Sequence, residues 1–195
     1  MRLKVYAGLA LMVGACTTAR EPDPSTSARE VIEARGRAVL EALKARDETR
    51  LAALVHPTKG VRFSPYAYVH SDSDVVIKRE QIPGIYASGT KRVWGTADGS
   101  GAPIELTFAE YDKRFVYNAD YLSAPRVAYD SLPLHSGNTP SNLDTAYPGA
   151  HRVEYHFPGF DPKYDGMDWT SLWLVFGREG EAWYLVGVVH GMWTI

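Results

Sequence analysis

The sequence predicts an α+β domain in which an N-terminal helical hairpin packs on a curved antiparallel sheet. Residues 27–57 place apolar side chains every three or four positions, the period of a helix, and contain no aromatic residue. Of the 23 aromatic residues, 22 follow residue 60, where short apolar runs are separated by turn residues. Helices followed by aromatic-rich strands are the element order of an α+β fold.

The composition excludes several classes of protein. With 195 residues, of which 45% are hydrophobic and 23% charged, the chain is too apolar for a disordered protein and has the length of one domain. A formal net charge of −2 leaves no basic excess for a phosphate backbone, so nucleic acid is not expected as a partner. The single cysteine, Cys16, excludes an internal disulfide and a thiolate metal site.

The first 15 residues are typical of a signal peptide. Arg2 and Lys4 precede an uncharged, mostly apolar run over residues 5–15 that is too short to span a bilayer. The run ends in Val-Gly-Ala-Cys, which resembles the bacterial lipobox. The resemblance implies cleavage before Cys16 and its acylation with fatty acids such as palmitate. It also implies a bacterial cell-envelope location, at the outer membrane facing the periplasm in a Gram-negative organism.

The lipobox divides the chain into three parts. Residues 1–15 are the expected signal peptide. Residues 16–26 are the lipidated cysteine and a flexible tether, because residues 17–26 hold two prolines and no large apolar side chain. Residues 27–195 are expected to form a single α+β domain.

Two helices are expected at the start of this domain. Ser27 and Glu30 match a capping box, after which one apolar face is formed by Ile32, Gly36, Val39, Leu40 and Leu43. Asp47 is placed to cap a second, short helix that Pro57 ends. With a single apolar face, this hairpin must pack on another element.

The remaining elements are short until the C-terminal quarter. A second capping box at Thr107 and Glu110 predicts a helix, and residues 118–149 are expected to be mostly loop, with one helical turn near 141–146. The strands are expected at Val61–Phe63, Val75–Ile77, Thr90–Thr96, His151–Phe157, Thr170–Phe176 and Ala182–His190.

The last two strands form the clearest hairpin, joined by a turn at residues 178–181. Both of its faces are apolar: Leu172, Leu174 and Phe176 alternate with Trp173 and Val175. A sheet with one face in water would alternate apolar and polar residues. The hairpin is therefore covered on both sides, or one face lines an apolar pocket.

Two resemblances to known families follow from longer segments. Residues 42–47 (ALKARD) and 51–57 (LAALVHP) are similar to the opening of the NTF2-like (SnoaL-like) superfamily, which implies an NTF2-like or cystatin-like cone. Four blocks resemble a family of uncharacterised bacterial lipoproteins, and this resemblance implies no activity. The blocks are residues 55–66, 94–117, 153–169 and 183–195.

One group of cations marks a candidate anion site. His56, Lys59 and Arg62 lie around Gly60 at the corner between the second helix and the first strand, where they could cradle a small anion. The same residues could equally end the helix, with basic side chains at its negative end and the glycine in a turn.

Motifs for catalysis, metals and nucleotides are absent from the sequence. Asp161, Asp165 and Asp168 are too few carboxylates for a calcium loop and lack the EF-hand pattern. No H-E-x-x-H, G-x-S-x-G or glycine-rich phosphate loop occurs. Accordingly, no metal, no cofactor and no catalytic residue is predicted.

A ligand site is expected where strand ends and the loop before the last hairpin converge. The helices that the sequence predicts are too few and too short to cover both faces of the sheet, so part of one face should form a concave wall. Polar-tipped aromatic residues, imidazoles and one carboxylate are expected around this concavity, namely Tyr66, Tyr68, His156, Asp168, Trp169 and His190.

Three functions fit these observations. The first is a membrane-anchored, non-catalytic envelope module that binds a small, partly apolar ligand or a partner protein. The second is an NTF2-like enzyme that pairs His156 or His190 with a carboxylate such as Asp112. The third is an envelope protein that docks a partner through its sheet and residues 118–149, without a pocket.

Overall fold

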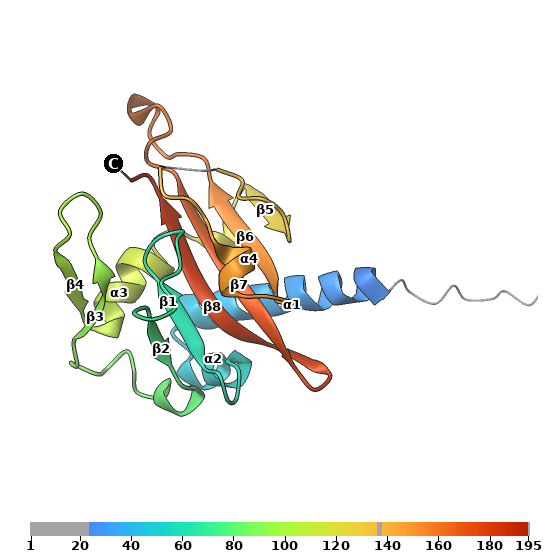
Figure 1. Cartoon of the computed structure of the whole chain (residues 1–195). Helices are drawn as coiled ribbons and strands as arrows, with labels where there is room; N and C mark the ends of the chain where they lie inside the picture. The colour runs from blue at the N-terminus through green and yellow to red at the C-terminus, as the bar shows by residue number, and fades with distance from the viewer. Residues whose placement is uncertain (1–23, 136–137, 195) are drawn as a thin grey trace, which may run out of the picture.

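The computed structural model describes residues 24–135 and 138–194, and within them the α+β class is confirmed. A six-stranded sheet has the order β2-β1-β8-β7-β6-β5, and β3 pairs with β4 in a separate hairpin (Figure 1). The strands are β1 (Val61–Ser64), β2 (Val75–Ile77), β3 (Arg92–Thr96), β4 (Pro103–Leu106), β5 (Arg126–Tyr129), β6 (His151–Phe157), β7 (Thr170–Glu179) and β8 (Ala182–Met192).

The N-terminal helical hairpin lies on one face of this sheet (Figure 1). Its helices are α1 (Pro24–Ala45) and α2 (Glu48–Leu54). The predicted inward face of α1 is buried, and Gly36 allows its close approach because a Cβ there would lie 2.5 Å from the Tyr155 hydroxyl. Asp47 caps α2 as expected, accepting a hydrogen bond from the Arg50 amide at 2.9 Å.

The predicted start of α1 at Ser27 is wrong. The helix begins at Pro24, and a proline is compatible with a first helical turn because the amide it lacks would be unpaired there. The predicted tether is therefore too long by residues 24–26. Residues 1–15, Cys16 and residues 17–23 lie outside the described part of the chain, so the signal peptide and lipidation stay predictions.

One strand pairing departs from the expected antiparallel sheet. β1 runs parallel to β8, whereas β1–β2, β5–β6, β6–β7 and β7–β8 are antiparallel. A parallel neighbour needs a crossover connection, and here nearly the whole domain lies between β1 and β8. The order of the strands in the sequence does not show which strand pairs with β1.

The connection between β4 and β5 contains α3 (Phe108–Tyr111), followed by one turn of π-helix at Asp112–Val116. The capping box at Thr107 is confirmed, since the Thr107 amide donates to Glu110 Oε2 at 2.8 Å. The strands β4 and β5 were not predicted, because each has only four residues and β5 does not alternate buried and exposed positions. The short helix α4 (Leu143–Ala146) lies where one helical turn was expected.

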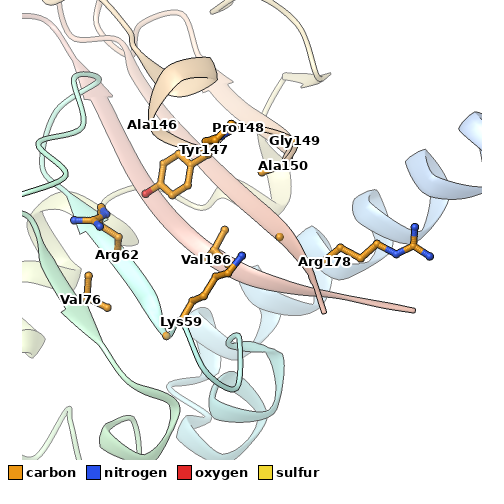
Figure 2. Close-up of a pocket in the computed structure, with 12 residues that line it drawn as sticks. Lys59, Arg62, Val76, Ala146, Tyr147, Pro148, Gly149, Ala150, Arg178 and Val186 are labelled. Carbon is orange, nitrogen blue, oxygen red and sulfur yellow. The ribbon is translucent and has the colours of Figure 1, made fainter. Parts of the chain in front are cut away.

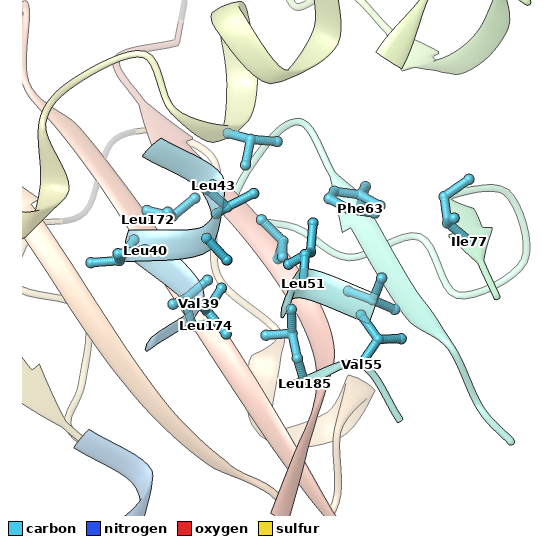
Figure 3. Close-up of a cluster of buried hydrophobic side chains, with 14 of the residues drawn as sticks. Val39, Leu40, Leu43, Leu51, Val55, Phe63, Ile77, Leu172, Leu174 and Leu185 are labelled. Carbon is cyan, nitrogen blue, oxygen red and sulfur yellow. The ribbon is translucent and has the colours of Figure 1, made fainter. Parts of the chain in front are cut away.

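The main core fills the space between the helices and the sheet (Figure 3). Val39, Leu40 and Leu43 of α1 meet Leu172 and Leu174 of β7 there. Beside them, Phe63, Trp94, Phe108, Tyr111 and Phe115 form an aromatic cluster of edge-on and stacked rings. Large aromatic side chains thus fill this part of the space between the helices and the sheet.

A smaller apolar cluster covers part of the opposite sheet face. It joins Trp173 and Val175 of β7 to Val189 of β8, under Val69 and Leu143. The prediction that both faces of the last hairpin are apolar and covered therefore holds for this region. None of the described helices is both long and apolar enough to cross a membrane.

The buried hairpin gives a first test of the fold. Phe176 is fully buried against Leu185, and its replacement by alanine is expected to lower the free energy of unfolding by about 3–5 kcal/mol. Chemical denaturation measures this loss. Val127→Ala is the control, because this strand residue is 53% exposed and should cost less than about 0.5 kcal/mol. A loss below about 1 kcal/mol for Phe176→Ala would show that the strand faces are reversed.

Candidate functional site

An open cavity of about 510 Å³ lies on the sheet face opposite α1, beyond the smaller apolar cluster (Figure 2). It extends from β1 and β2 to β7 and β8, and the segment after α4 forms its far wall. Its volume is within the range of small-molecule sites. The described lining residues are Lys59, Gly60, Arg62, Val76, Ala146, Tyr147, Pro148, Gly149, Ala150, Gly177, Arg178 and Val186.

The charged side chains among the described lining residues of this cavity are all basic. Lys59, Arg62 and Arg178 line it, and no aspartate or glutamate is among its described lining residues. Within residues 24–135 and 138–194, none of these three cations forms an ion pair with a carboxylate. The described lining of the cavity is therefore positively charged, and an opposing charge comes from the buried Asp74 carboxyl, whose pKa is raised by burial and lowered by the Arg62 charge.

The three cations differ in orientation. In Figure 2 the Arg178 side chain extends away from Tyr147, and its Nε donates to the Gly180 carbonyl at 3.0 Å. Lys59 and Arg62 come from opposite ends of the β1 side of the cavity. Arg62 Nη1 donates to the Ser71 carbonyl at 2.7 Å, which holds its guanidinium in place. Lys59 and Arg62 are thus the cations available to a bound anion.

Tyr147 forms the wall that faces these cations (Figure 2). Its ring packs on β8 at Gly187, where a Cβ would lie 2.6 Å from the tyrosine hydroxyl. The buried hydroxyl lies close enough to the Arg62 guanidinium to interact with it. Burial raises the pKa of Tyr147, and the nearby Arg62 guanidinium opposes that rise. Sequence patterns missed Tyr147 because it follows a single helical turn in a segment without periodicity.

His56 is the member of the predicted anion cradle that does not reach the cavity. It is fully buried, and its Nδ1 accepts hydrogen bonds from the amides of Thr58 and Lys59, at 3.3 and 3.2 Å. Its Nε2 lies 3.6 Å from Glu179. Burial lowers the pKa of His56, followed by the charge of Lys59. His56 therefore shapes the turn that carries Lys59, as the helix-ending alternative expects, and anion binding stays a prediction.

The six residues expected around one concavity all lie toward one end of the sheet, but they do not share a cavity. His156 pairs with Ser171 in register, whereas His190 pairs with Leu172. Because neighbouring residues on a strand point to opposite faces, the two histidines lie on opposite faces of the sheet. The expected single concavity is wrong.

His156 belongs to a buried chain of polar groups. Its Nδ1 lies 2.8 Å from Ser171 Oγ, and that hydroxyl donates to Glu154 Oε1 at 2.7 Å. The Leu134 amide donates to the other carboxylate oxygen of Glu154. Burial lowers the pKa of His156 to about 4 and raises the pKa of Glu154. The side chains are almost inaccessible, so this chain ties residue 134 to the sheet.

His190 is held on the α1 face of the sheet. Its Nδ1 donates to the Pro65 carbonyl at 3.2 Å, and its Nε2 lies 3.0 Å from Thr170 Oγ1. Burial lowers the pKa of His190 to about 4. Asp112, the carboxylate suggested as its partner, interacts instead with Tyr86 and Arg46, and burial raises its pKa to about 6. Asp112 therefore interacts with groups other than His190.

The other four predicted residues lie in two further places. Tyr66 and Tyr68 line a shallow groove together with His70. Trp169 lies beside His135 and His156, with ring centres 4.7 and 6.0 Å away. Asp168 closes the preceding loop, because its Oδ2 accepts hydrogen bonds from the amides of Phe160 and Asp161.

Two carboxylates of the loop between β6 and β7 have partners within the protein. Asp161 pairs with Lys163 at 2.8 Å, while Asp168 binds backbone amides. No group of three or more histidine, cysteine or acidic residues could hold an ion within the part of the chain described.

Comparison with known proteins gives little beyond the fold. No protein-family model and no curated protein matches the chain. Among solved structures, a designed NTF2-like protein, whose printed name begins Rd1NTF2_05, has 16% sequence identity. The match covers 87% of this chain and all of that one, with a TM-score of 0.32. The α+β assignment therefore rests on the helices and strands described above, and the resemblance to lipoproteins stays a prediction.

The two neutral histidines predict a measurable pH effect. The unfolded-state pKa of histidine is about 6.5 and the folded-state pKa of His190 is about 4, so protonation favours unfolding. The stability that neutral His190 contributes is full above pH 6.5 and is lost as the pH falls toward 4. The slope is at most about 1.4 kcal/mol per pH unit.

Urea denaturation of the wild type and of His190→Gln between pH 4 and 7.5 measures the stability that neutral His190 contributes. The comparison of the two proteins removes the effect of the buried carboxyl groups Asp74 and Glu154, whose raised pKa values change the stability in the opposite direction. The difference in unfolding free energy between the two proteins should shrink as the pH falls. A difference that is constant with pH would show that His190 titrates normally in the folded protein.

Proposed function

We propose that this protein is a non-catalytic binding module of the bacterial envelope that holds a small, partly apolar anion in the cavity beside β1 and β8. The observation that carries the proposal is the pair Lys59 and Arg62, which line the cavity without a carboxylate partner in the described residues. A bound anion would supply a counter-charge. Hydrogen bonds to charged groups contribute about 1.5–3 kcal/mol each.

The remainder of the lining favours a ligand with an apolar body. Val76 and Val186 form the floor, and the Tyr147 ring stands against them (Figure 2). Ala146 and Pro148 complete an apolar wall next to the cations. A ligand with one carboxylate or phosphate group and a small ring would match both parts of this surface.

Lipidation of Cys16 would keep this cavity close to a membrane. Seven residues separate Cys16 from Pro24, where α1 begins, and an extended chain of this length reaches at most about 25 Å. Each buried CH₂ of an acyl chain contributes about 0.8 kcal/mol, so several chains give a stable anchor. The ligand would then be met at or near the membrane surface of the envelope.

The lipid anchor is tested by Cys16→Ser. This variant should remain uncleaved and unacylated, and mass spectrometry of the protein isolated from a bacterial host should show residues 1–15 still attached. Wild type should carry acyl chains on Cys16 and fractionate with membranes. A variant that is still cleaved before residue 16 and fractionates as before would contradict the lipoprotein assignment.

The anion site is tested by calorimetry on the domain with inorganic phosphate and phenyl phosphate as probes. Phenyl phosphate should bind more tightly than phosphate, because its ring reaches the apolar wall. Lys59→Ala and Arg62→Ala should each weaken its binding about tenfold, the equivalent of 1.4 kcal/mol.

Lys113→Ala is the matched control, because Lys113 is exposed on the turn after α3 and does not line the cavity. It should leave the affinity unchanged. Equal affinities for wild type, Lys59→Ala and Arg62→Ala would contradict the proposed site, as would the absence of binding at millimolar concentrations of either probe.

A further inference from the structure

A second concavity lies between residues 66–70 and the loop of the β3–β4 hairpin. Its volume is about 290 Å³, and it is shallower than the cationic cavity. No lysine or arginine is among its described lining residues. The lining contains aromatic and polar side chains that are exposed or half-buried, chiefly Tyr66, Tyr68, His70, Thr96, Asp98 and Thr139.

The aromatic side of this groove is held in place by the fold. The Tyr66 ring packs edge-on against Phe115 of the core, and its hydroxyl accepts a hydrogen bond from the Asp98 amide at 3.1 Å. The His70 amide donates to Asp74 Oδ2 at 2.9 Å, and Asp74 is buried beside Ser64. Both walls of the groove are therefore fixed before any ligand arrives.

Tyr68 is the more exposed of the two tyrosines in this groove. Its side chain is 41% exposed, and its ring leans on the His70 imidazole with the ring centres 5.0 Å apart. On the opposite side, Gly101 leaves open space where a side chain would stand, since no atom lies within 4 Å of a Cβ built there. The groove thus offers an aromatic surface on one side and accessible backbone on the other.

We propose that this groove binds a neutral glycan, with one pyranose ring lying against Tyr68. A pyranose ring has apolar C–H faces and a periphery of hydroxyl groups. The face matches an exposed tyrosine ring, and the hydroxyls match the threonine hydroxyls on the rim. The absence of cations from the described lining separates this site from the anion cavity, so the inference stands independently of the proposed function.

The test is a titration of the domain with chitotetraose and with cellotetraose, followed by two-dimensional NMR. Both are neutral chains of pyranose rings, but only chitotetraose carries acetamido groups. Either glycan, or both, should shift the signals of Tyr66, Tyr68 and His70. A preference for one of them would identify whether the acetamido group is recognised.

Tyr68→Ala should weaken the binding at least about tenfold, whereas Tyr68→Phe keeps the ring and should bind within about threefold of wild type. Tyr164→Ala is the control, because Tyr164 is 45% exposed but lies on the loop between β6 and β7. Lys59→Ala should not change the glycan affinity. Unchanged binding in Tyr68→Ala, with its fold intact by circular dichroism, would overturn the proposal, as would the absence of shifts with both glycans at millimolar concentration.

Discussion

The β7–β8 hairpin is apolar on both faces, and the arrangement of the other elements follows from the need to cover it. On one face α1, α2 and the aromatic cluster near α3 form a continuous core. On the other face α4 and the residues around Val69 cover Trp173 and Val175. The cover stops short of β1 and β2, and the cationic cavity is the part of this face that remains open.

The buried polar groups belong to the structure of the domain. His156 and His190 are each satisfied by neighbours on their own face of the sheet, and both remain neutral because burial lowers their pKa values. A proton-transfer role would require them to reach a substrate, but the side chains are almost completely covered. The proposed ligand would instead meet Lys59 and Arg62, which line the open cavity and form no ion pair within residues 24–135 and 138–194.

Helical period predicted α1, although its start lies at Pro24 and not at Ser27, and the capping residues Asp47 and Thr107 predicted the starts of α2 and α3, because these signals are local. Strand register, in contrast, is set by contacts between residues that lie far apart in the sequence. Whether His156 and His190 share a face depends on a single-residue offset between Ser171 and Leu172, which no sequence pattern reveals. Lys59 and Arg62 could be found from their charge beside a glycine turn. Tyr147 could not, because it reaches the cavity from a segment that looks like loop.

The central claim is that the uncovered part of the second sheet face is an anion site. The most direct measurement is the mapping of phenyl phosphate on the domain by nitrogen-15 and methyl chemical shifts. The account predicts that shift changes concentrate at Lys59, Arg62, Tyr147 and Val186, and that they saturate with a single affinity. Changes confined to the groove at Tyr68, or spread evenly over the exposed lysines and arginines, would contradict it.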